Sequence, residues 1–143
     1  MNSIYMQSRP VSVAAAPLYL HGSVQAGFPS PAEDLGAQPM DLGRMLVTHP
    51  QSTFLLRARG TSMVGAGIFD RDILVVDRVI EPRHEHIVVA VVDGEFTVKT
   101  LHQQGARVQL RAANPAYPDI VPAEGQTLEI WGVVTASIHQ FIR

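Results

Sequence analysis

Two residues of this chain have side chains and surroundings that could support nucleophilic chemistry. The first is Lys99, the only lysine in the chain, whereas ten of the eleven basic residues are arginine. It lies in the apolar run FTVKTL, residues 96 to 101. A buried lysine can lose its proton and act as a general base, whereas an arginine stays charged. Lys99 is therefore a candidate proton acceptor.

The second residue is Ser62, a candidate nucleophile. It lies in the glycine-rich stretch GTSMVGAG, residues 60 to 67, directly after a β-rich segment. Such loops expose backbone N–H groups and can present a hydroxyl at the end of a sheet. The hydrolase motif G-x-S-x-G is not met, because Val64 stands where the second glycine belongs. No histidine has a diagnostic triad spacing to Ser62, so from the local residues alone an ordinary loop serine is the simpler interpretation.

The sequence around Lys99 predicts a β-hairpin. Asp93-Gly94 separates two β-rich runs, 87–92 and 95–102, and Asp-Gly favours a two-residue turn. This turn would set three strand pairs: Val92 with Glu95, Ala90 with Thr97, and Val88 with Lys99. Both faces of the hairpin are largely apolar, so we expect it to be covered on both sides. Lys99 is then either a buried amine kept for chemistry, or a side chain whose amine reaches water at a sheet edge.

The histidines do not indicate a metal site. His84 and His86 flank Glu85, but no third ligand stands out, and loop histidines are the simpler interpretation. We therefore predict no metal and no cofactor. The absence of cysteine excludes thiolate zinc sites and thiol nucleophiles, and it fits a cytoplasmic location.

The elements that must position these residues fall into two regions. Residues 1–43 contain five prolines and only four charged side chains, which predicts an extended arm. A short helix over 41–49 would point Leu42, Met45 and Leu46 inward. From residue 53 onward the pattern is typical of strands, expected at 53–59, 72–77, 87–92, 95–102, 107–112 and 128–135. We predict a mainly β, antiparallel domain with an extended N-terminal arm.

Charge and hydropathy limit the partners of this domain. The formal net charge of -2 gives no electrostatic case for binding nucleic acid or anionic membranes. The longest strongly apolar run, 87–92, is far shorter than the about 20 residues that a membrane span needs. Direct sequence-specific DNA binding and membrane association are therefore not expected.

Three linked motifs resemble the self-cleaving domain of LexA-type repressors, and more closely the UmuD- and MucA-like mutagenesis proteins. They are GTSM at 60–63, FDRDILVVD at 69–77 and DGEFTVK at 93–99. The similarity extends from about residue 26 to residue 134. It implies a LexA/signal-peptidase-like β fold with a serine–lysine dyad, in which Ser62 is the nucleophile and Lys99 the general base. The backbone N–H groups of Thr61 and Ser62 would stabilise the oxyanion.

The resemblance also implies a cleavage site within the chain itself. The family cuts between a small residue and glycine, which points to Ala26 and Gly27. Ala66-Gly67 is the other such pair, but it lies too close to Ser62 to fold back. Cleavage would separate an arm of residues 1–26 from a β-rich core domain of residues 27–143.

Function and partners follow from the same resemblance. The protein would be its own substrate and a homodimer, and a RecA filament on single-stranded DNA would stimulate cleavage in the SOS response. The processed form would serve a UmuC-like Y-family polymerase as an accessory subunit in translesion synthesis. Two alternatives are a non-catalytic β interaction module and a LexA-like transcriptional regulator. Residues 1–26 are too few for the helix-turn-helix of a regulator.

Overall fold

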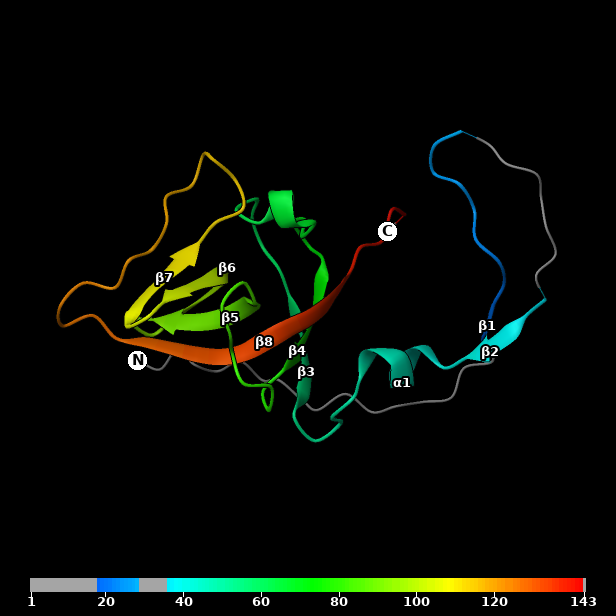
Figure 1. Cartoon of the computed structure of the whole chain (residues 1–143), viewed down its shortest axis with the longest axis horizontal. Helices are drawn as coiled ribbons and strands as arrows, with labels where there is room; N and C mark the ends of the chain where they lie inside the picture. Colours follow the sequence, from blue (N-terminus) through cyan, green and yellow to red (C-terminus); the bar gives the residue numbers. More distant parts are fainter. Residues whose placement is uncertain (1–17, 29–35, 143) are drawn as a thin grey trace.

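The computed structural model of the chain describes residues 18–28 and 36–142. It is mainly β, as predicted, with two antiparallel sheets (Figure 1). The smaller sheet pairs β1 (Leu18–Leu20) with β2 (Gln38–Met40). The larger sheet contains β3 (Thr53–Arg57), β4 (Ile73–Asp77), β5 (Ile87–Val92), β6 (Glu95–Gln104), β7 (Arg107–Arg111) and β8 (Leu128–Ile138).

The order of strands in the larger sheet is β3-β4-β8-β5-β6-β7. Strands β3 and β4 pair with each other, and β5 to β7 form a meander of neighbours in sequence. The last strand, β8, lies between these two groups and pairs with β4 on one side and with β5 on the other. In Figure 1 it runs the length of the sheet as the long orange-red arrow. The sheet is therefore continuous only because β8 joins its two parts.

The β5–β6 hairpin has the predicted register. Val88 is paired with Lys99, and Ala90 with Thr97. The turn residue Asp93 has a φ of 48°, as the two-residue turn requires of both its central positions. The Asp-Gly signal thus placed Lys99 correctly along its strand.

The hairpin is covered on both faces, which confirms the expectation from its apolar pattern. One core cluster consists of Ala58, Met63, Ile68, Leu74, Val76 and Val89. The other consists of Val88, Ala90, Leu101, Leu110 and Val133. Neighbouring residues of β5 belong to opposite clusters because side chains alternate along a strand. The strand pair that carries Lys99 is therefore held from both sides.

The N-terminal region differs from the expectation in two ways. It includes the short β1–β2 ladder, in which Tyr19 is paired with Pro39. Proline has no backbone N–H to donate, but an edge strand tolerates it. The helix α1 (Leu42–Leu46) begins at the Asp41 cap, but Leu42 and Met45 are 40% and 55% exposed. The prediction that these two residues point inward is wrong, since a helix of five residues is too short to bury a whole apolar face. Leu46, the third residue of that prediction, is half-buried. Residues 1–17 of the predicted arm lie outside the described residues.

The predicted strands are present with small shifts at their ends. The first ends at Arg57 rather than at residue 59, and the last extends to Ile138 rather than to residue 135. Among residues 18–28 and 36–142, no helix has the length and apolar character needed to cross a membrane.

Candidate active site

The loop that carries Ser62 begins where β3 ends. Gly60 has a φ of +90°, a backbone conformation that residues other than glycine rarely adopt. This conformation lets the chain turn sharply away from the sheet. Its N–H donates to Asp70 Oδ1 at 2.7 Å. Met63 is 3% exposed and anchors the other side of the loop in the core. Ser62 is therefore fixed between a turn and a buried side chain.

A second segment, residues 113–117, holds the same loop from outside. The Ala113 N–H donates to the Ser62 carbonyl at 2.8 Å. Asn114 Nδ2 donates to the Thr61 carbonyl at 2.9 Å, and the Thr61 hydroxyl lies 2.9 Å from the Tyr117 hydroxyl. These contacts order the backbone on both sides of the candidate nucleophile.

Gly65 allows this segment to approach. Its N–H donates to the Ala113 carbonyl at 2.7 Å. A Cβ at Gly65 would lie 2.5 Å from the same carbonyl oxygen, which is backbone and cannot swing away. A glycine is thus required here for close packing rather than for its dihedral angles.

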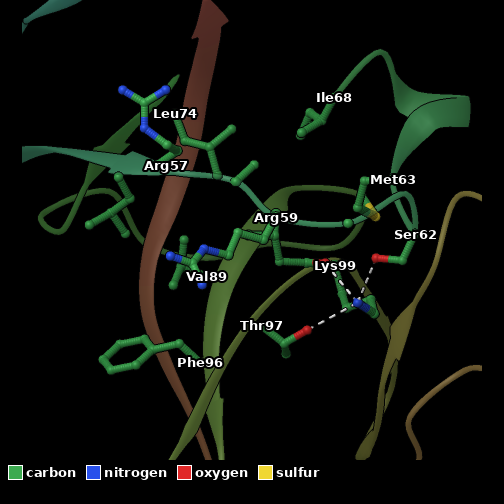
Figure 2. Close-up of a pocket in the computed structure, with 14 residues that line it drawn as sticks. Arg57, Arg59, Ser62, Met63, Ile68, Leu74, Val89, Phe96, Thr97 and Lys99 are labelled. Atoms are coloured by element: carbon green, nitrogen blue, oxygen red, sulfur yellow. Dashed lines mark hydrogen bonds between the residues drawn. The ribbon is translucent and has the colours of Figure 1, made fainter. Parts of the chain in front are cut away.

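Lys99 reaches Ser62 from strand β6 (Figure 2). Its Nζ lies 3.0 Å from Ser62 Oγ, 3.0 Å from Thr97 Oγ1 and 3.1 Å from the Val98 carbonyl oxygen. The β6–β7 ladder begins at Thr100, so residues 97–99 form an edge of β6 that β7 does not cover. The amine turns around this edge toward the Ser62 loop. The structure thus brings the two predicted dyad residues into direct contact.

Lys99 is largely buried rather than exposed at the sheet edge. The residue is 8% exposed. Burial lowers the pKa of the Lys99 amine below its ordinary value, because it removes water that would solvate the ammonium. Among the described residues, no carboxylate forms an ion pair with Lys99. These surroundings favour the neutral amine that a general base must be.

The three contacts also orient that neutral amine. An ammonium would donate to all three oxygen atoms, but a neutral amine has two N–H bonds and one lone pair. The Val98 carbonyl can only accept, and Thr97 Oγ1 can accept the second hydrogen. The lone pair then faces Ser62 Oγ. This arrangement suits removal of the Ser62 hydroxyl proton.

The dyad lies at a cleft of about 280 Å³. The cleft is bounded by the end of β3, the Ser62 loop and the free edge of β6, with Leu56, Arg59, Phe96 and Val98 among its lining residues (Figure 2). In the described part of the chain, no hydrogen bond uses the backbone N–H of Thr61 or Ser62. Both N–H groups remain available to a ligand, which is compatible with the predicted oxyanion role.

The predicted cleavage residues are placed elsewhere. Ala26 and Gly27 lie in an exposed bend after β1, and no residue of 18–28 lines the cleft. The blue segment in Figure 1 shows this stretch away from the six-stranded sheet. The structure therefore assembles the dyad without bringing Ala26 and Gly27 to it.

Sequence reasoning did not assign a role to several residues that support the site. Thr97 could have been found, because a residue two positions before Lys99 lies on the same face of a strand. Asn114 and Tyr117 are far from Ser62 in sequence and gave no local signal. Their contribution depends on how the loop after β7 folds back.

Comparison with known proteins agrees with the fold. A family model described as Peptidase S24-like matches residues 17–135. The chain is 44% identical to Protein SamA of Salmonella typhimurium over 94% of this chain and 91% of that protein. It is 40% identical to Protein MucA of Escherichia coli over 94% of this chain and 92% of that protein. It is 35% identical to the LexA repressor of Syntrophotalea carbinolica over 95% of this chain and 66% of that protein.

Proposed function

Because the chain belongs to the Peptidase S24-like family, we propose that it is a latent serine peptidase that cleaves itself between Ala26 and Gly27. The observation that supports this most strongly is the 3.0 Å contact between the buried Lys99 amine and Ser62 Oγ. The exposed position of Ala26-Gly27 outside the cleft accounts for latency, since the arm must move before it can be cut.

The reaction follows from the atoms at the dyad. The Ser62 hydroxyl gives its proton to the neutral Lys99 amine while Oγ attacks the Ala26 carbonyl carbon. The N–H groups of Thr61 and Ser62 stabilise the resulting oxyanion. The Lys99 ammonium then protonates the Gly27 nitrogen as the peptide bond breaks. Water hydrolyses the ester between Ser62 and Ala26, and Lys99 again accepts a proton.

The processed form consists of residues 27–143 and acts as a homodimer in SOS mutagenesis. The similarity to MucA and its relatives supports this role. In this proposal a RecA filament on single-stranded DNA stimulates cleavage in the cytoplasm. The product then serves a UmuC-like Y-family polymerase as accessory subunit during translesion synthesis.

We expect the rate of self-cleavage to rise with pH. Only the neutral Lys99 amine is a base, so below its pKa the rate increases about tenfold per pH unit. Because burial lowers that pKa, the rate levels off below pH 10.5, the ordinary value for lysine. The measurement is incubation of the purified chain from about pH 7 to about pH 10, with the fragments weighed by mass spectrometry.

A cut after Ala26 is the expected result at every pH, with fragments 1–26 and 27–143. A cut elsewhere, or a rate that falls as the pH rises, would contradict the proposal. A parallel sample at neutral pH with a RecA filament tests stimulation. No cleavage in either sample would favour a non-catalytic interaction module.

Thr97 is expected to act as a positioning residue for Lys99. Thr97→Val keeps the shape of the side chain but removes the oxygen that accepts from Nζ at 3.0 Å. The maximal cleavage rate should fall roughly tenfold, the value of one hydrogen bond of about 1.4 kcal/mol. The midpoint of the pH profile should also move to lower pH, because an acceptor stabilises the ammonium.

Thr97→Ser is the matched control, since it restores the hydroxyl and should recover both the rate and the midpoint. A purely structural role for Thr97 would lower the thermal stability without moving the pH midpoint. That outcome would remove Thr97 from the mechanism.

A further inference from the structure

Three side chains outside the active site converge at the end of β6. They are His84 and Glu85 from the loop before β5, and His102 from β6. One ligand atom from each lies within 4.8 Å of the others. Glu85 Oε1 is 3.1 Å from His84 Nε2 and 3.8 Å from His102 Nδ1. The two imidazole rings meet edge to face, with 4.7 Å between their centroids.

The backbone fixes this arrangement. The Glu85 N–H donates to the Leu101 carbonyl, and the Leu101 N–H donates to the His86 carbonyl, so the loop runs alongside β6. Glu85 has a φ of +73°, which is uncommon for a residue with a side chain and often accompanies a functional site. The fold thus adds a third candidate ligand to His84 and Glu85 that the sequence alone did not indicate. This ligand is His102 and not the neighbouring His86.

His102 provides an independent indication that something binds here. The residue is 9% exposed, and its Nδ1 is the one fully buried side-chain nitrogen or oxygen without a hydrogen-bond partner among the described residues. A buried polar atom without a partner is costly, and native proteins rarely leave one unsatisfied. Nδ1 lies on the Glu85 side of the ring, within the cluster. A ligand that accepts its lone pair would remove the cost.

We propose that His84, Glu85 and His102 form a binding site for a divalent transition-metal ion of the zinc class. Two imidazoles and one carboxylate are ligands that suit Zn²⁺, whereas Mg²⁺ and Ca²⁺ require oxygen ligands. Ligands around a tetrahedral zinc lie about 3.4 Å apart, and the distances of 3.1 and 3.8 Å lie on either side of this value. His84 and Glu85 are exposed, so water can fill a fourth position.

One contact limits the affinity of this site. The Gln103 N–H donates to His84 Nδ1 at 3.0 Å, which places the proton of the neutral ring on Nε2. Metal binding at Nε2 moves this proton to Nδ1 and breaks the contact with Gln103. Because the contact is exposed, water can take over the Gln103 N–H at modest cost. We therefore expect binding at micromolar rather than nanomolar zinc.

The test is calorimetric titration of the full-length chain, without an affinity tag, with Zn²⁺ and separately with Mg²⁺. The expected result is one Zn²⁺ per chain and no binding of Mg²⁺. His84→Ala and Glu85→Gln change exposed residues and should each weaken Zn²⁺ binding at least about tenfold. His102→Ala should do the same, with circular dichroism to confirm that this buried variant is folded.

His86→Asn is the matched control. His86 Nδ1 accepts the Arg83 N–H at 3.1 Å, and the asparagine oxygen can replace it, so this neighbouring histidine should be dispensable for binding. Absence of Zn²⁺ binding, or equal binding by the wild-type chain and the His84→Ala variant, would overturn the proposal. A loss in His86→Asn as large as in His84→Ala would also overturn it.

Discussion

Replacing Ser62 by alanine is expected to abolish self-cleavage between Ala26 and Gly27, with a loss of at least about 10⁴-fold. The Ser62 hydroxyl stands 3.0 Å from the Lys99 amine at the end of a loop with two available N–H groups. Thr97 Oγ1 is equally near the amine, but it lies within strand β6 and not beside those N–H groups. Ser62 is therefore the nucleophile in our proposal. The measurement is the amount of fragment 27–143 formed over time at about pH 10.

Ser137→Ala is a suitable control for this variant. Ser137 is an exposed serine on β8, away from the cleft lining, and its loss should leave the rate unchanged. Ser62→Ala should also fold normally, because the loop is held by backbone contacts that alanine retains. Cleavage at the wild-type rate in a folded Ser62→Ala chain would refute the assignment of the nucleophile.

Lys99→Arg is expected to be as inactive as Ser62→Ala, although it keeps a cation at the same position. A guanidinium stays protonated and cannot accept a proton at any pH at which the protein is folded. If Lys99 served only as a fixed positive charge, arginine would preserve part of the activity. The measurement compares self-cleavage of the wild-type chain and of Lys99→Arg over the full pH range, by the masses of the fragments. It shows whether Lys99 acts as a base or only as a positive charge.

Lys99→Met shows whether inactivity is caused by loss of the base or by loss of the fold. Because burial lowers the pKa of Lys99, the folded state carries the cost of a buried ammonium at low pH, and this cost diminishes as the pH rises toward 10.5. Methionine removes the cost, so the variant should melt at an equal or higher temperature near neutral pH and still not cleave. Cleavage by Lys99→Met would exclude a role for lysine as the base.

Local sequence signals were sufficient for the strand that carries Lys99. Asp93-Gly94 fixed the turn, and alternation fixed the register, so Val88 faces Lys99 as predicted. Both signals act over a few residues, and tertiary contacts did not override them. The burial of Lys99 was left open by the same pattern, because it depends on the Ser62 loop that covers the edge of β6.

Local patterns could not predict features that depend on residues outside the same strand or loop. One such feature is the pair of hydrogen bonds that join Asn114 and Tyr117 to Thr61. Another is the contact of His102 with Glu85. The inward face predicted for α1 failed for a related reason. Periodicity identifies an apolar stripe, but it does not supply an element for the stripe to pack against, and Met45 stays exposed.

The central position of β8 also determines when during synthesis the six-stranded sheet can be completed. Ser62 follows β3 and Lys99 lies on β6, and each belongs to a group of strands that can pair as soon as it has been made. Among the described strands, only β8 pairs with both groups. Residues 128–138 are synthesised after the other five strands of this sheet, and until then no described strand pairs with both groups. In our proposal, the sheet that supports the nucleophile and the base is therefore complete only after the other strands have been made.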